Sequence, residues 1–206
     1  MNMEWTSLVT VCDLVATFAF ATVGARVAAA KGMDFGGIAL IAAVSSLSGG
    51  TLRNLFLLKS PSWIINPWLL SSVALAVLFT ILRGSSEPVG RFFLSLDTFG
   101  LAVATVSSTE FALRLNANPI IAAVLGLIGG VTGGLLRDVL AQVEPVLLHR
   151  ETIASSCLAG AAIFVGLNEL HINRFIPVTI GALVVVAVRE LSIYFKWNLP
   201  RIAPKN

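Results

Sequence analysis

Two stretches of this sequence carry a glycine pair followed, three residues later, by an arginine. They are residues 48–54 (SGGTLRN) and 132–138 (TGGLLRD), both in apolar surroundings. Adjacent glycines weaken a helix by roughly 1 kcal/mol each relative to alanine, and glycine and serine pairs are sites where helices kink. A kink frees backbone carbonyls, which together with nearby hydroxyls can replace part of the hydration shell of a cation. The pattern predicts an ion pathway along these candidate residues: Ser48, Gly49, Gly50, Thr51, Thr132, Gly133 and Gly134.

The same glycines also have a purely structural explanation. Gly126, Gly130 and Gly134 follow a small-xxx-small spacing, and the first stretch has an equivalent pattern. In membrane helices this spacing usually means close helix packing. Packing alone and an ion pathway therefore both stay open here, and the arginines are the feature that favours the pathway.

An arginine near the middle of a membrane costs at least about 2.5 kcal/mol, so its side chain normally faces a cavity or a charged partner. Static ion pairs that fix the helices, or aspartates placed at helix N-termini, explain the same residues without a pore. Asn54 stands where the second stretch has Asp138, which makes the two halves electrically unequal and would bias an ion path. The candidate pore-facing or paired charges, with this asparagine, are Asp13, Arg53, Asn54, Asp97, Arg137 and Asp138.

The chain as a whole has the composition of a membrane protein. Of its 206 residues, 56% are hydrophobic and 12% are charged, which is about half the roughly 25% charge of an average soluble domain. Its net charge of +3 comes from basic residues scattered between apolar runs, so we expect a lipid bilayer and no nucleic acid as its partner. The sequence has no dinucleotide fingerprint, phosphate loop, nucleophile elbow or Cys/His ligand set. We therefore predict that it is not an enzyme and holds no metal or cofactor, apart from a permeating K⁺ or Na⁺.

Seven stretches are candidates for membrane-spanning helices, each of which needs about 20 mostly apolar residues. The sixth is short and is expected to extend into its flanks. The fold class predicted from them is an all-α integral membrane protein with seven transmembrane helices. The segments are residues 8–30, 36–58, 64–82, 92–112, 119–142, 152–167 and 176–195.

The first six segments form two copies of one three-helix unit. When the sequence is shifted so that Asp13 falls on Asp97, the two glycine pairs coincide and Ser71-Ser72 falls on Ser155-Ser156. Because each unit has an odd number of helices, the second enters the membrane from the opposite face. The result is an inverted repeat of the kind found in transporters. We predict a single membrane domain over 1–206, with repeats at 8–82 and 92–167 and a seventh helix at 176–195.

This topology offers each arginine a carboxylate. The first helix begins and the second ends on the outer side, so Asp13 is available to Arg53. By the same argument Arg137 finds Asp97 on the cytoplasmic side, with Asp138 adjacent.

Lysines and arginines of the connections set the orientation. One side holds eight: Arg26, Lys31, Arg83, Arg91, Arg150, Lys196, Arg201 and Lys205. The other side holds three: Lys59, Arg114 and Arg174. The N-terminus is then predicted outside and the C-terminus in the cytoplasm of a multi-pass protein of the cell (inner or plasma) membrane. Arg189 and Glu190, near the end of the last segment, are expected to snorkel to the interface and have no assigned function.

The doubled Gly-Gly-x-Leu-Arg-Asp/Asn element resembles that of the prokaryotic TRIC (trimeric intracellular cation) channel family, also described from sequence as a glycine-transporter-type domain. The resemblance covers nearly the whole chain. It implies a homotrimer in which each protomer has its own pore between the repeats, permeable to potassium and less selectively to sodium. It also implies kinks at the two glycine pairs. The family pattern favours a third glycine at Ser48 and Thr132 and an acid at Asn54, so the resemblance carries the fold over to this chain but not the kink sharpness or the ion preference.

Three functions compete at this stage. The first is a passive channel for monovalent cations, which the resemblance favours. The second is a secondary transporter of a small solute such as glycine, which an inverted repeat alone would favour. The third is a membrane scaffold that transports nothing.

Overall fold

All regular structure within the described residues is helical. The computed structural model describes residues 3–83, 90–143, 152–170 and 172–195. Five helices are long and apolar enough to cross a membrane: α1 (over Val9–Ala30), α2, α5, α6 and α9. Two more, α4 and α8, are apolar but shorter, so the chain is an all-helical, multi-pass membrane protein. The helices are α1 (Met3–Ala30), α2 (Phe35–Phe56), α3 (Ser62–Ile65), α4 (Trp68–Arg83), α5 (Arg91–Arg114), α6 (Pro119–Leu140), α8 (Thr152–Asn168) and α9 (Phe175–Phe195).

Helix ends follow the repeat register, which is the shift that places Asp13 on Asp97. In this register α2 and α6 begin and end at equivalent positions, α1 and α5 end at equivalent positions, and α4 and α8 begin at equivalent positions. After α2 and α6 the chain adopts a left-handed conformation at Leu58 (φ 54°) and Gln142 (φ 51°). The next amide closes the turn on the side of the helix, from Lys59 to the Asn54 carbonyl and from Val143 to the Asp138 carbonyl. Equivalent positions thus end their helices with the same C-terminal turn.

The third predicted segment is wrong in one respect, because the structure divides it. Residues 64–82 were expected to form one helix, but the chain forms the short α3, leaves the helix at Asn66 (φ −119°, ψ 93°) and starts α4 at Trp68. Pro67 explains the break, since proline lacks an amide hydrogen and disfavours the helical conformation in the residue before it. The α3 turn lies over the end of α2, where Ser62 contacts the first arginine.

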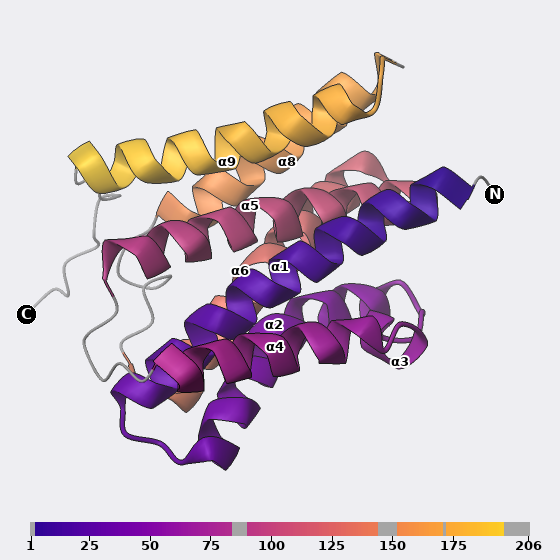
Figure 1. Cartoon of the computed structure of the whole chain (residues 1–206). Coiled ribbons are helices and arrows are strands. Elements are labelled where there is room, and N and C mark those ends of the chain that lie inside the picture. The colour runs from indigo at the N-terminus through magenta and orange to yellow at the C-terminus, as the bar shows by residue number, and fades with distance from the viewer. Residues whose placement is uncertain (1–2, 84–89, 144–151, 171, 196–206) are drawn as a thin grey trace, which may run out of the picture.

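The helices form two groups. Helices α1, α2 and α4 pack against one another, and so do α5, α6 and α8, with α9 lying against α8 and α5. The groups meet where α1 packs on α5 and α2 packs on α6. In Figure 1, α1 starts at the right and α5 starts at the left beside the grey trace, so these equivalent helices run in opposite directions.

Each group has its own apolar core. The core of α1, α2 and α4 contains small residues such as Ala25, Ala42 and Ala76, which let these helices approach closely. The core of α5, α8 and α9 includes Leu101 and also takes in Phe20 from α1 of the other group. Phe20 therefore crosses from one group into the core of the other.

The first glycine of each pair lies where α2 and α6 cross. A Cβ built on Gly49 would overlap the carbonyl oxygen of Gly129, and a Cβ built on Gly133 would overlap that of Ser45. These two contacts are equivalent in the repeat register. Both helices run as α-helix through their glycine pairs, so the predicted kink does not take the form of a broken helix. Close packing, one of the two explanations open from the sequence, accounts for the first glycine of each pair.

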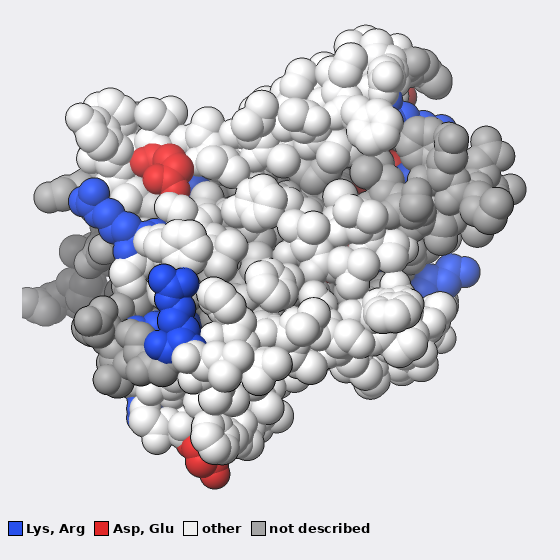
Figure 2. Space-filling view, viewed as in Figure 1, with Lys and Arg blue, Asp and Glu red and all other residues white. Residues whose placement is uncertain are grey.

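The surface separates charged ends from an apolar middle. Figure 2 shows lysines, arginines and acids gathered at the two ends of the visible face, with other residues between them. Large apolar side chains of the middle, such as Leu75 and Leu183, are each 60% exposed. Such a surface is unfavourable in water and suits the hydrocarbon core of a bilayer.

Candidate functional site

Arg53 is held in a polar cluster near the outer end predicted for α2. It is 1% exposed, and its Nη2 lies 3.2 Å from Oδ2 of Asp13. Its Nε donates to Oδ1 of Asn54 at 2.9 Å, and Nη2 donates to the Ser62 hydroxyl at 3.1 Å. Ser107 of α5 donates to Oδ1 of Asp13 at 2.6 Å. The guanidinium is thus neutralised and hydrogen-bonded, as a buried charge must be to persist.

The α3 turn completes this cluster. The Asn54 amide donates to the Ser60 carbonyl at 2.7 Å and to the Ser62 hydroxyl at 3.2 Å. The Trp63 indole donates to the Thr51 hydroxyl at 3.1 Å. Sequence reasoning missed the contacts of Ser62 and Trp63 because it left both residues in the connection before the segment 64–82. The Asn66-Pro67 sequence was the signal that could have shown the turn.

Arg137 has a corresponding cluster on the second group. Its Nη1 lies 2.6 Å from Oδ1 of Asp97, and its Nε lies 2.8 Å from Oδ1 of Asp138. The other oxygen of Asp97 accepts from Nη2 of Arg189, in α9, at 3.1 Å. The sequence prediction for Arg189 is therefore wrong: this side chain is 3% exposed and does not snorkel to the interface. Two carboxylates beside one arginine require a second cation, and α9 supplies it.

The two clusters have the same formal charge. In the first, Arg53 balances Asp13 and Asn54 is neutral. In the second, two arginines balance two aspartates. The electrical inequality expected from Asn54 is therefore offset by Arg189, a residue that lies outside the duplicated region. Its position inside an apolar span was the available signal, because a charge there needs a partner.

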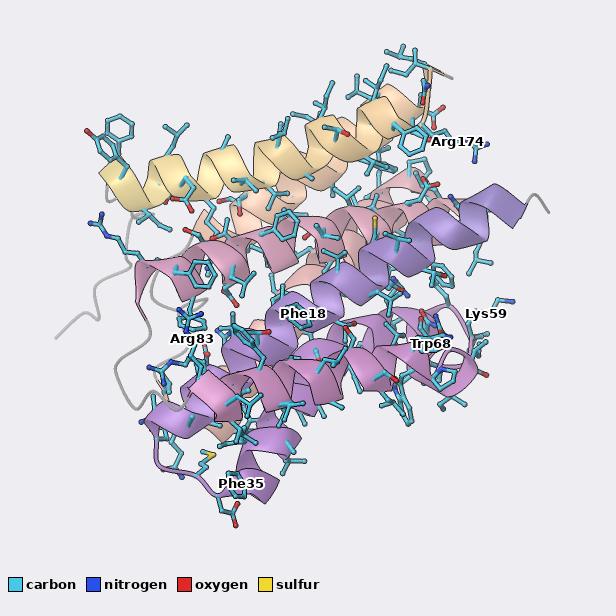
Figure 3. The ribbon with its side chains drawn as sticks, in the orientation of Figure 1. Phe18, Phe35, Lys59, Trp68, Arg83 and Arg174 are labelled. Atoms are coloured by element: carbon cyan, nitrogen blue, oxygen red, sulfur yellow. The ribbon has the colours of Figure 1, made fainter. Side chains whose placement is uncertain are left out.

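A chain of cavities follows the boundary between the two groups. A cavity of about 550 Å³ opens at the end of the molecule that carries Lys59 and Arg174, which Figure 3 shows opposite the end that carries Arg83. It shares Asp13 and Ser62 with a cavity of about 40 Å³. A third cavity, of about 20 Å³, shares Phe20 with the second.

The last cavity of the chain has a volume of about 260 Å³. It shares the second charge cluster with the 20 Å³ cavity, because Asp97, Arg137 and Arg189 line both. Lys31, in the turn after α1, lies at its edge. Each charge cluster thus lies between a large cavity toward one end of the molecule and a small cavity nearer its middle.

The two small cavities are equivalent in the repeat register. Each is bounded by the aspartate, the arginine and the second glycine of its own group. The equivalent lining residues, with the 40 Å³ cavity named first, are Asp13 and Asp97, Thr17 and Leu101, Ser46 and Gly130, Leu47 and Val131, Gly50 and Gly134, Thr51 and Leu135, Arg53 and Arg137, Leu69 and Ile153, and Ala104 and Phe20. The same architecture therefore builds both halves of the cavity chain.

Most predicted site residues line one of these cavities. Gly49, Gly50, Thr51 and Gly133 line the 40 Å³ cavity, and Gly134 lines the 20 Å³ cavity. Ser48 and Thr132 line none of these cavities. The Thr132 hydroxyl donates to the Ile128 carbonyl of its own helix at 2.6 Å, which satisfies it locally. The structure thus groups the glycines and charges and leaves two predicted hydroxyls aside.

Known proteins are similar to this chain in sequence. The family model described as "Glycine transporter" matches the chain twice, over residues 10–84 and 94–169. The chain is 30% identical over 198 residues to the inner membrane protein YadS of Escherichia coli K12, an alignment that covers 93% of this chain and 94% of that protein.

Solved structures extend the likeness to three dimensions. The TRIC trimeric intracellular cation channel orthologue from Rhodobacter sphaeroides matches with a TM-score of 0.85 and 32% identity, covering 93% of this chain and all of that one. A second structure, described as a basis for conductance through TRIC cation channels, matches with a TM-score of 0.83 and 29% identity over 96% of this chain and 98% of that one. The resemblance inferred from the doubled glycine–arginine element is confirmed, and the chain belongs to the TRIC channel family, whose sequence model carries the description "Glycine transporter".

Proposed function

We propose that this protein is a passive channel for monovalent cations, permeable to potassium and less selectively to sodium. The observation that carries the proposal is the match to the Rhodobacter sphaeroides TRIC channel over 93% of the chain. A second TRIC structure of 29% identity supports the same function. The relative YadS is named an inner membrane protein, which supports the cell membrane as the location.

The proposed architecture has seven membrane spans in two inverted repeats plus α9, with a homotrimer as the assembled form. The opposite directions of α1 and α5 and the shared register of helix ends support the inverted repeat. We propose an outer N-terminus and a cytoplasmic C-terminus. The charge count behind this orientation loses Arg26, which is buried within α1, and becomes seven against three. Of those seven, Arg150, Lys196, Arg201 and Lys205 lie outside the described residues.

The proposed pathway runs along the chain of cavities between the helix groups. Arg53 and Arg137 would repel a cation if they were unpaired, because charge interactions are strong in a low-dielectric interior. Their carboxylates cancel this field, which leaves the pathway without a net positive barrier at either cluster. A water needs roughly 10–15 Å³ of such cavity volume, so the cavities of about 40 and 20 Å³ hold only a few waters. A hydrated cation does not fit, and this arrangement corresponds to a closed channel.

A secondary transporter of a small solute such as glycine is the second candidate. The description of the matching family model favours it, and inverted repeats with sites at their interface are common among transporters. A membrane scaffold is the third, and no observation favours it.

Planar-bilayer recording of the purified protein under a potassium/sodium gradient tests the proposal. We expect unitary current steps and a reversal potential displaced toward that of potassium, because a channel passes many ions per opening. Glycine uptake by liposomes made from the same preparation is the control. Saturable glycine uptake without current steps would replace the channel with the transporter, and neither signal would leave only the scaffold.

Replacing Gly134 with valine should suppress the conductance. A Cβ at Gly134 has no contact closer than 3.7 Å, to Nη2 of Arg137, so the helix can accept the side chain. The branched methyl groups would then occupy the 20 Å³ cavity that Gly134 lines. Unitary current in bilayers is the measurement. Gly166→Val in α8 is the matched control, since a Cβ there meets nothing within 4 Å. Normal conductance of a correctly assembled Gly134→Val protein would remove this glycine from the pathway.

A further inference from the structure

Phe20 occupies a special place in the chain of cavities. Within the described part of the protein, it is the one residue that lines both the 40 Å³ and the 20 Å³ cavity. Its side chain is buried, with 4% exposure. Whatever passes from one small cavity to the other must therefore pass this ring.

Missing side chains on the neighbouring helices make room for the ring. A Cβ built on Gly100 of α5 would lie 3.6 Å from both Cδ1 and Cδ2 of Phe20. A Cβ built on Gly133 of α6 would lie 4.0 Å from Cδ2. The ring is thus in van der Waals range of two helices of the other group, at positions where no side chain competes with it.

The two halves of the molecule differ at this point. The residue equivalent to Phe20 in the second repeat is Ala104. Ala104 reaches into the 40 Å³ cavity as Phe20 reaches into the 20 Å³ cavity. One half of the pathway therefore carries a methyl group where the other half carries a phenyl ring.

The walls of the two small cavities also differ at two equivalent positions, which are polar in the 40 Å³ cavity and apolar in the 20 Å³ cavity. In the 40 Å³ cavity, Thr17 and Thr51 contribute hydroxyls. The equivalent positions of the 20 Å³ cavity are Leu101 and Leu135. Phe20 and Leu101 also belong to one apolar core cluster. The ring therefore stands beside an apolar stretch in the wall of the 20 Å³ cavity, and hydrophobic constrictions exclude ions by losing their water.

We propose that Phe20, together with Leu101, is the gate of this protein: a hydrophobic barrier on the side of the second repeat that keeps the pathway closed. The inference rests on the proposed channel function and adds to it the residues that close the channel. Opening then requires the Phe20 ring to leave its place between Gly100 and Gly133.

The test compares bilayer currents of variants at Phe20 with the wild type. Phe20→Ala and Phe20→Asn should each raise the time-averaged potassium current severalfold, the first by removing the ring and the second by letting water enter. Phe20→Leu keeps an apolar side chain and should stay close to wild type. Phe18→Ala is the matched control, because Phe18 lies on the same helix with 39% exposure and should leave the current unchanged.

The internal repeat suggests two further variants: one that should lower the current, and one that tests the barrier without changing Phe20. Ala104→Phe places a second ring in the larger of the two small cavities, which Ala104 lines, and should reduce the current severalfold. If Phe20→Ala fails to fold, Leu101→Thr tests the same barrier, since the first repeat has threonine at the equivalent Thr17; it should raise the current. Folded Phe20→Ala and Phe20→Asn proteins that conduct like the wild type, or a Leu101→Thr protein that does so, would overturn the gate and leave the channel intact. Silence of the wild type and of every folded variant would instead reject the channel function itself.

Discussion

Replacing Gly49 or Gly133 with alanine should destabilise the protein strongly. The added Cβ would overlap the backbone carbonyl of Gly129 or of Ser45, and a backbone carbonyl cannot swing aside as a side chain does. Overpacking typically costs about 1–3 kcal/mol and occasionally more, so we expect a loss of about 3 kcal/mol from the free energy of unfolding. Denaturant titration of the protein in detergent, followed by circular dichroism, measures it.

The second glycine of each pair is the matched control. At Gly50 and Gly134 the closest atom to an added Cβ is a guanidinium nitrogen, at 3.8 Å and 3.7 Å. Alanine should be accepted there, and its better helix propensity of about 1 kcal/mol offsets any small adjustment. If Gly49→Ala were as mild as Gly50→Ala, helices α2 and α6 would not cross as closely as the structure has them.

Removing the extra carboxylate and the extra arginine of the second cluster together should do less harm than the sum of the two single removals. Asp138→Asn leaves one arginine unbalanced, and Arg189→Met leaves one aspartate unbalanced. Breaking a buried ion pair by removing one partner costs about 3–5 kcal/mol, which is the loss expected for each single variant. The double variant has one aspartate, one arginine and one asparagine, the combination of the first cluster at Asp13, Arg53 and Asn54.

The measurement is a double-mutant cycle on the free energy of unfolding. We expect the double variant to lose less than the sum of the singles by about 1–3 kcal/mol, within the range of residues that share a network. Glu190→Gln is the control, because Glu190 is exposed beside Arg189 and exposed substitutions usually stay within about 0.5 kcal/mol. Additive losses from Asp138→Asn and Arg189→Met would mean that α9 does not balance the charge of the second cluster.

This balance gives the seventh helix a defined part in the molecule. It lies outside the duplication, yet Arg189 lies 3.1 Å from an oxygen of Asp97, the aspartate that also holds Arg137. The second cluster has Asp138 where the first has the neutral Asn54. Its additional negative charge is balanced by the positive charge of Arg189, which has no counterpart in the first cluster. An electrical difference between the halves is thereby avoided. The remaining difference is steric and apolar, and it centres on Phe20.

The sequence by itself determines the elements of this protein and their internal correspondence. Apolar length predicts the spans, because a membrane helix must satisfy its backbone internally and cover about 30 Å of hydrocarbon. The repeat register predicts which residues are equivalent, and the helix ends follow it. The carboxylates named for Arg53 and Arg137 lie beside them, since the cost of a charge in the membrane leaves few partners to choose from.

Only the tertiary structure decides which groups meet across the two helix groups. The role of Gly49 and Gly133 depends on how α2 crosses α6, which spacing along one helix does not specify. The burial of Arg189 depends on where α9 docks, and the contacts of Ser62 and Trp63 depend on how α3 folds over α2. In the sequence, Phe20 is one apolar residue among many in a spanning segment. Only the packing of the two helix groups places its ring between two cavities. Distances between separate helices are set by packing, and a sequence pattern records only which face of a helix is apolar or small.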